Sequence, residues 1–164
     1  MSSYTTMITV LAVILAGAIF GFFYAWLCST MWGLDEIDPR MAITAMQAIN
    51  ARVQNVVFFP AFFLTPAALA VAAIFLTMQG FRQVALWFVA ATIVYIVLGM
   101  GVTLFGNVPM NEKLAATPVP DDLEQARAIW QDYSRKWQQW NLIRTIGSGL
   151  SLALAAFGLT RLSA

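Results

Sequence analysis

The sequence contains no histidine and only one cysteine, Cys28. Without histidine the chain cannot build a bis-histidine haem, a histidine-rich zinc site, a Glu-x-x-His di-iron site or a Ser–His–Asp triad. A single cysteine excludes an internal disulfide and a CxxC redox motif. We therefore expect neither a metal nor a cofactor, and acid–base chemistry would fall to the few carboxylates and basic side chains.

Charge is also scarce. Only 10% of the 164 residues are charged, against about 25% in an ordinary soluble domain, while 60% are hydrophobic. This composition predicts a membrane protein, and membrane lipid is the expected surrounding. A net charge of +1 offers no concentrated basic face, so nucleic acid is not expected as a partner.

Four apolar stretches are long enough to cross a bilayer, which takes about 20 helical residues. They cover residues 7–32, 56–78, 84–105 and 142–162. The more polar segments 34–55 and 107–140 are expected to form a helical cap outside the membrane. The sequence thus predicts one domain, an all-α integral membrane four-helix bundle with both chain ends on the same side.

Basic residues are divided unevenly between the two ends of this predicted bundle. The end with the termini holds Arg82 and Arg161, whereas the cap end holds Arg40, Arg52, Lys113, Arg127, Arg135, Lys136 and Arg144. Because loops rich in Lys and Arg stay in the cytoplasm, the cap is predicted to be cytoplasmic. We expect a multi-pass protein of the bacterial inner membrane.

Three local signals predict helix ends. Asp38 before Pro39 is a helix start, and the helix that begins there is expected to run on into the second span. Gly80 is expected to end that span. Asp121 followed by Glu124 resembles a capping box and predicts the start of the last helix.

Proline and glycine predict interruptions inside the spans. Pro60 and Pro66 should kink the second span and free backbone carbonyls near residues 56 and 62, either for packing or to shape a cavity. Gly106 and Pro109 are expected to break the third helix.

Small and aromatic residues of the first span predict its surroundings. Gly17 and Gly21 form a GxxxG pair that permits close helix packing. Tyr24, Trp26 and Trp32 are expected to mark one membrane interface.

A polar and aromatic stripe precedes the fourth span. Trp130, Tyr133, Trp137, Asn141 and Arg144 recur at intervals of three or four, so they share one helix face. Arg144 stands near the entry of the span. It either reaches out to lipid head groups or points inward to an anion, a carbonyl or an ion-pair partner.

The partners open to an inward-pointing Arg144 are Asn107, Asn111, Asp132 and Glu112, of which Glu112 is the best placed in sequence. Asn107 and Asn111 either satisfy backbone groups where the helix breaks or line the polar end of an apolar cavity. Two roles are open for three tryptophans, Trp130, Trp137 and Trp140. They either anchor the protein at the membrane interface or form walls of a pocket for a flat aromatic or quinone-like ligand.

The segments AMQAIN (45–50), GNVPMNEKLA (106–115) and WQQWNLIRT (137–145) occur in this order and resemble the anthrone-oxygenase-like family. These are small four-helix membrane proteins, mostly described as a domain of unknown function. The resemblance marks six signature positions: Asn107, Pro109, Asn111, Trp140, Asn141 and Arg144. It implies that some relatives oxidise an anthrone to an anthraquinone with molecular oxygen and no obvious metal or flavin. Histidine commonly follows the Trp–Asn pair in the family, and here that position is Leu142.

Three functions remain open from the sequence. The favoured one is a non-enzymatic accessory, scaffold or hydrophobic-ligand-binding protein, with a quinone or polycyclic aromatic as ligand and a second copy or another membrane protein as partner. The alternative is a cofactor-independent oxygenase acting on an anthrone-like or quinol-like substrate that enters from the bilayer. A transporter or channel is least favoured, because few intramembrane charges line a path.

Site residues follow from these readings. The catalytic candidates are Arg144, which would stabilise an oxyanion, and Glu112, the one obvious base nearby. The expected ligand-binding residues are Asn107, Asn111, Trp137, Trp140, Asn141 and Arg144.

Overall fold

A computed structural model describes residues 2–162, and within them every regular element is a helix. The predicted all-α class is therefore confirmed. Three of the elements are π-helical turns, in which each amide bonds five residues back. The elements in chain order are α1 Ser3–Ala25, η1 Trp26–Thr30, α2 Met31–Asp35, α3 Pro39–Arg52, α4 Phe58–Met78, α5 Arg82–Val94, η2 Tyr95–Gly101, η3 Thr103–Asn107, α6 Val108–Ala115 and α7 Leu123–Thr160.

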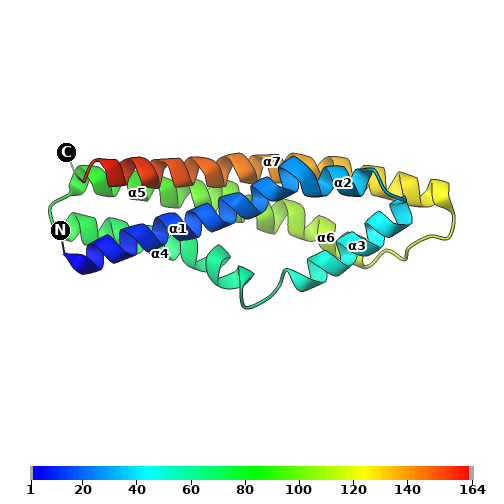
Figure 1. The fold of residues 1–164 in the computed structure, drawn as a ribbon, viewed down its shortest axis with the longest axis horizontal. Helices are drawn as coiled ribbons and strands as arrows, with labels where there is room; N and C mark the ends of the chain where they lie inside the picture. Colours follow the sequence, from blue (N-terminus) through cyan, green and yellow to red (C-terminus); the bar gives the residue numbers. More distant parts are fainter. Residues whose placement is uncertain (1, 163–164) are drawn as a thin grey trace.

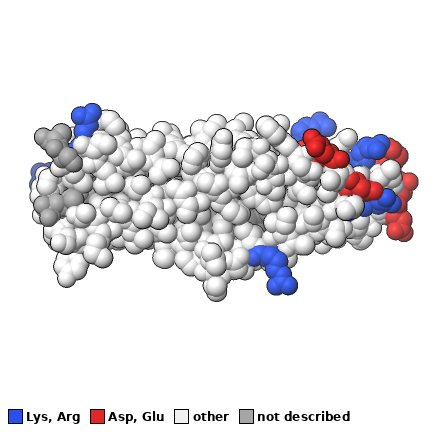
Figure 2. All heavy atoms as spheres, viewed as in Figure 1, with Lys and Arg blue, Asp and Glu red and all other residues white. Residues whose placement is uncertain are grey.

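Four continuous helices are long and apolar enough to cross a membrane, which makes the chain an integral membrane protein. They run over Ser3–Asp35, Phe58–Met78, Arg82–Ala115 and Leu123–Thr160. Figure 1 shows an elongated bundle whose two termini lie at the same end, as an even number of spans requires. Figure 2 shows most charged side chains at the opposite end, with the long middle of the visible face almost free of charge.

The α3 helix begins as the sequence predicts, and α4 ends as predicted. Asp38 Oδ1 accepts the backbone N–H of Arg40 at 2.9 Å, and the Arg40 guanidinium returns to the same carboxylate at 2.6 Å. Hydrogen bonds from the Arg40 side chain and backbone lower the pKa of Asp38 from its ordinary 3.8 to about 2. After α4, Gly80 takes a φ of 88°, a left-handed conformation that favours glycine.

The helix that starts at Pro39 does not continue into the second span, so that expectation was wrong. The chain leaves helical geometry after Arg52, and Asn55 Oδ1 accepts the backbone N–H groups of Val57 and Phe58 at 2.8 and 3.0 Å. This side chain satisfies the first amides of α4, and so the second span starts afresh at Phe58.

The predicted proline effects hold at only one position. Pro60 lies in the first turn of α4, where a missing N–H needs no partner. Pro66 lies inside the helix and leaves the carbonyl of Phe62 without its backbone donor, as expected. The hydroxyl of Tyr95 on the neighbouring helix donates to that carbonyl at 2.9 Å.

The third span does not break at Gly106 and Pro109, contrary to the sequence expectation. Helical backbone continues from Arg82 to Ala115 through η2 and η3. Pro109 falls in the first turn of α6, directly after the π-helical residues, where its missing N–H is tolerated. The Gly106 backbone instead lies against Trp140, because a Cβ there would come within 2.6 Å of the indole ring.

The start of the last helix lies one residue later than expected. Asp122, in extended conformation, accepts the backbone N–H of Gln125 at 2.7 Å and is the N-cap. The predicted capping box at Asp121 and Glu124 is thus wrong, because α7 begins at Leu123. Glu124 instead pairs with Arg127 at 2.6 Å on the surface.

Close helix packing occurs at a different glycine from the one expected. Nothing within the described chain lies within 4 Å of a Cβ placed at Gly21, and Gly17 has only ordinary contact with Leu152. A Cβ at Gly147 would lie 2.3 Å from Leu98 Cβ, so α7 and the third helix touch nearly backbone to backbone there.

The buried residues form two apolar clusters along the bundle axis. The larger lies between the spans and includes Phe23, Leu69, Phe88 and Tyr95. The second lies in the cap, where α3, α6 and α7 meet α2. Trp26 belongs to this second cluster and is only 7% exposed, so its predicted interface role was wrong, whereas Tyr24 and Trp32 do lie exposed.

Candidate functional site

A cavity of about 350 Å³ lies where the cap joins the spans. Its wall is mostly apolar and aromatic, with polar groups at the cap side. Helices α1, α3, α4, α6 and α7 and the turns η1 and η3 all contribute. The lining residues are Phe22, Trp26, Gln47, Ile49, Asn50, Ala51, Val53, Gln54, Phe58, Phe59, Phe62, Phe63, Thr103, Leu104, Val108, Asn111, Glu112, Ala115, Trp137 and Arg144.

Arg144 is the most deeply buried charge on this wall, at 5% exposed. The α7 helix carries it inward on the predicted stripe, so it does not reach out to head groups. Its guanidinium carbon lies 4.2 Å from the ring centre of Phe23 and 4.9 Å from that of Trp137, which are cation–π distances. Aromatic faces therefore hold the cation from the protein side.

The hydrogen bonds of Arg144 leave most of its donors unused. Nε donates to Asn141 Oδ1 at 2.9 Å, and no acceptor among residues 2–162 meets the two terminal nitrogens. The described chain holds three ion pairs, and none includes Arg144. Of the partners left open by the sequence, neither Glu112 nor Asp132 forms an ion pair with Arg144 in the described residues, and Asp132 pairs with Lys136 instead.

Asn141 holds Arg144 in place from behind the cavity wall. It is 1% exposed and does not line the cavity. Its Oδ1 accepts from Arg144, and its Nδ2 donates to the backbone carbonyl of Phe23 at 3.2 Å. Both ends of the amide are engaged, so Asn141 links α1 to the guanidinium.

Asn111 forms the polar end of the cavity on the cap side. Its Oδ1 accepts from Trp137 Nε1 at 2.9 Å and from the Tyr133 hydroxyl at 2.8 Å. Asn50 Nδ2 in turn donates to the Tyr133 hydroxyl at 3.4 Å. Gln47 lies nearby and donates to the carbonyls of Leu114 and Thr117 at 2.8 and 2.9 Å. These bonds orient α6 against α3 and α7.

Two of the expected site residues lie away from the cavity. Asn107 is fully buried and donates to the backbone carbonyl of Trp137 at 3.2 Å, while its Oδ1 has no partner among residues 2–162. Trp140 is 40% exposed and packs on Gly106. The structure thus brings Asn111, Trp137 and Arg144 onto one wall, with Asn141 directly behind them.

The position at which the resemblance implies a histidine, Leu142 in this chain, also lies outside the cavity. Leu142 follows the buried Asn141, and successive helix residues point about 100° apart. It is 43% exposed and is not part of the cavity wall. A histidine there would not reach the Arg144 guanidinium from inside the cavity.

The aromatic wall was not predicted from the sequence as a site. Trp26, Phe22 and the phenylalanines of α4 supply most of it, and Phe58 stacks on Phe62 with ring centres 5.4 Å apart. A signal was present in the segment FFPAFF at 58–63, where aromatic residues crowd the start of a span. Trp26 belongs to η1, and Thr103 and Leu104 belong to η3. Such π-helical turns within α-helices are frequent at functional sites.

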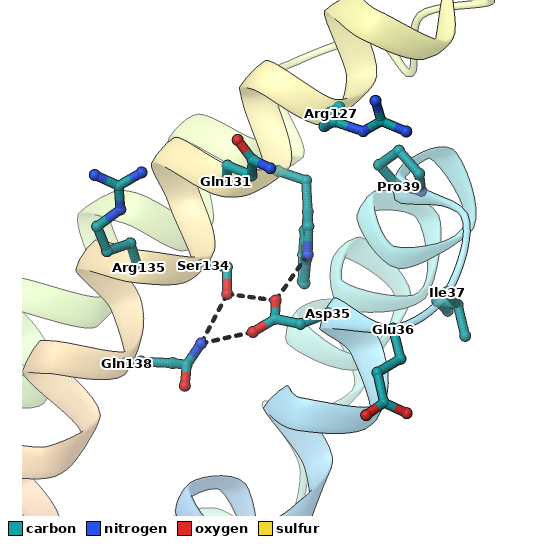
Figure 3. Close-up of a pocket in the computed structure, with 10 residues that line it drawn as sticks. Asp35, Glu36, Ile37, Pro39, Arg127, Gln131, Ser134, Arg135 and Gln138 are labelled. Carbon is teal, nitrogen blue, oxygen red and sulfur yellow. Dashed lines mark hydrogen bonds between the residues drawn. The ribbon is translucent and has the colours of Figure 1, made fainter.

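A second, shallower hollow lies on the cap around Asp35, at the end of α2 (Figure 3). Asp35 Oδ1 accepts from Trp130 Nε1 at 2.9 Å and from the Ser134 hydroxyl at 2.6 Å. Its Oδ2 accepts from Gln138 Nε2 at 2.9 Å, and Gln138 also donates to Ser134. These groups satisfy one another, and the cluster fastens α2 to α7. Asp35 was not among the site residues predicted from the sequence.

Among the described residues, no three His, Cys, Asp or Glu side chains gather closely enough to hold a metal ion. The fold and the site together define a four-helix integral membrane protein with an aromatic cavity between its spans and its cap. The model of the anthrone oxygenase family matches residues 41–154, so the chain belongs to this family and the resemblance is confirmed. No curated protein and no solved structure gives a significant match.

Proposed function

We propose that this protein is a cofactor-independent oxygenase that binds a flat, hydrophobic aromatic substrate of the anthrone or quinol type in the cavity below the cap. The observation that carries the proposal is Arg144, a nearly buried cation with unused N–H groups on the wall of an aromatic cavity. A cavity of about 350 Å³ lies within the size range of small-molecule sites, about 300–1,000 Å³. Membership of the anthrone oxygenase family supports the same reading.

The cavity wall fits a substrate that arrives from the lipid. Phe59, Phe63 and Leu104 line the cavity and are also exposed on the outside of the bundle. In a membrane this exposed face meets acyl chains, so a hydrophobic ring system can pass between α4 and the third helix without crossing water. Inside, the half-buried ring of Phe58 and the exposed rings of Phe59 and Phe63 offer surface for stacking, and the buried Trp137 holds Arg144 on the wall.

The chemistry uses groups on the same wall. Glu112, the one carboxylate that lines the cavity, takes a proton from the ring methylene that lies opposite the carbonyl in the central ring. The electron pair left behind moves onto the ring carbonyl oxygen, and the N–H groups of Arg144 stabilise that negative charge. The carbanion then reduces molecular oxygen and forms a peroxide at the former methylene carbon, and the proton held by Glu112 returns to the outer oxygen to give the hydroperoxide. Loss of water converts this carbon to the second carbonyl, so one oxygen atom enters the quinone and the other leaves as water.

A second candidate function is binding of the same ligand without turnover. It is favoured by the carboxylate of Glu112, which is exposed and is oriented by no hydrogen bond within the described residues. An unoriented base is a weak catalyst, whereas ligand binding requires only the aromatic wall and Arg144.

The test measures oxygen uptake and quinone formation when anthrone is added to the purified protein in detergent micelles. We expect a rate above the spontaneous one, one oxygen molecule consumed per anthrone, and loss of that rate in Arg144→Met. The matched pair Trp137→Phe and Trp140→Phe separates the cavity from the surface, and only the first should slow turnover. Saturable anthraquinone binding without turnover would favour the second candidate. Absence of both turnover and binding would overturn the proposal.

We further propose that the protein resides in the bacterial inner membrane with the cap in the cytoplasm. Support comes from the basic residues gathered at the cap end and from the termini at the other end (Figures 1 and 2). A periplasmic reporter such as alkaline phosphatase fused to the C-terminus should be active, and a cytoplasmic reporter such as green fluorescent protein should be dark. The reverse result would overturn this orientation.

A further inference from the structure

We propose that the cavity binds its ligand as the conjugate base, with an anionic oxygen held by the terminal N–H groups of Arg144. The inference rests on the proposed function and narrows its ligand class to acidic phenols and enols conjugated with a fused-ring carbonyl. On binding, the hydroxyl proton of such a ligand passes to the surrounding water. Ligand affinity therefore rises as the pH approaches the ordinary pKa of that hydroxyl and levels off above it.

The charges on the wall favour an anion beside Arg144. Arg144 and Glu112 are the two charged residues among its lining, and only Arg144 is buried. A guanidinium stays protonated, and a buried cation without a counter-charge is costly. Because the described chain supplies no acidic partner to Arg144, no carboxylate of these residues competes with an anionic ligand for its terminal nitrogens.

The same wall selects among anions. Trp26, Phe58 and Phe62 surround the space with aromatic carbon. A small, strongly hydrated anion would lose its water there and gain few contacts in return. A delocalised organic anion spreads its charge over a flat ring system, so its ring can pack on the aromatic wall while its oxygen meets Arg144.

Asn141 is a positioning residue for this site. Its Oδ1 accepts from Arg144 Nε, and its own Nδ2 donates to the Phe23 carbonyl of α1. The ring faces of Phe23 and Trp137 hold the guanidinium from the protein side. The two terminal nitrogens are thereby left for the ligand, and a planar guanidinium can grip one oxygen with both of them.

The experiment uses 2-hydroxyanthraquinone, whose phenolate absorbs at longer wavelength than the neutral phenol. The probe is titrated with pH in detergent micelles with and without the full-length protein. We expect the apparent pKa of the bound probe to fall by at least about one unit, which is a tenfold preference for the anion. Arg144→Met should abolish the shift. Arg135→Met, which removes an exposed arginine of the same helix, should leave it unchanged.

Two further variants keep the test decisive if Arg144→Met does not fold. Arg144→Lys retains the charge and should keep part of the shift. Asn141→Leu retains Arg144 and should reduce the shift while unionised anthraquinone still binds, which a general loss of folding would not produce. Saturable binding of the probe to the wild-type protein without any shift would overturn this inference and leave the proposed function standing. Failure of both the probe and anthraquinone to bind would overturn both.

Discussion

The hydroxyl of Tyr95 donates to the backbone carbonyl of Phe62 at 2.9 Å, and that carbonyl has lost its own backbone donor to Pro66. The bond joins the second and third spans beside the cavity. Tyr95→Phe leaves a buried acceptor unpaired and should lower the free energy of unfolding by about 1 kcal/mol. The measurement is denaturant unfolding in mixed micelles.

Pro66→Ala provides the matched background for this bond. With an N–H restored at residue 66, the Phe62 carbonyl regains its helical partner. Tyr95→Phe should then lower the free energy of unfolding clearly less in the Pro66→Ala protein than in the wild type. Equal losses of unfolding free energy in the two backgrounds would show that the Tyr95 hydroxyl does not stabilise the protein by donating to the Phe62 carbonyl.

Gly147 sets the distance between α7 and the third helix. Gly147→Ala would place a Cβ 2.3 Å from Leu98 Cβ, so the helices must separate, at a cost of about 1–3 kcal/mol. Gly21→Ala, with open space around its Cβ, should be neutral or slightly stabilising. Thermal unfolding of the two variants side by side tests the contrast, and equal melting temperatures would refute it.

Asp35 fastens the end of α2 to α7 through Trp130, Ser134 and Gln138. Asp35→Ala removes the shared acceptor of three hydrogen bonds and should lower the free energy of unfolding by at least about 1.5 kcal/mol, because each such bond contributes about 0.5–1.5 kcal/mol. Hydrogen exchange at residues 31–38 should also become faster. Glu36→Ala, a neighbouring exposed carboxylate, is the control and should change neither quantity. Unchanged exchange in Asp35→Ala would show that the cluster does not hold α2.

The Asp38 cap predicts an acid-sensitive contribution to the stability of α3. Its pKa is about 2 in the folded protein, against an ordinary 3.8. A carboxylate with a lowered pKa stabilises the fold above the ordinary value, and this contribution is lost as the pH falls from about 4 to about 2. Asp38→Asn cannot titrate, so its melting temperature should fall less steeply than that of the wild type across this window. Melting temperatures that fall in parallel for the two proteins would contradict the lowered pKa of Asp38.

How much of this site the sequence predicts depends on the range of the interactions involved. The Trp130–Arg144 stripe, the Asp38 cap and the glycine after α4 arise within one helix or turn, and each was predicted correctly. The aromatic wall joins residues from both halves of the chain, such as Trp26 and Trp137, whose ring centres lie 5.1 Å apart. Spacing along the sequence carries no information about such a contact.

Where predictions for single residues failed or stayed open, the reason is also a local physical one. Pro109 was expected to break a helix, but π-helical turns precede it and place it in a first turn. The surroundings of Arg144 were left open by the sequence, with Glu112 the best-placed partner, and aromatic rings and the amide of Asn141 surround it instead. Asn107 and Asn111 lie four residues apart and have different surroundings, one bound to a backbone carbonyl and the other on the cavity wall.

The most direct test of the central claim is to map where a flat diaryl ketone binds. Benzophenone, which resembles an opened anthrone, is photoactivated in the presence of the purified protein, and the labelled peptides are sequenced by mass spectrometry. We expect labels within residues 22–26, 47–63, 103–115 and 137–144, the segments that carry the cavity lining, and anthraquinone should suppress them. Labels that anthraquinone does not suppress, or that fall only outside these segments, would contradict the assignment of the cavity as the ligand site.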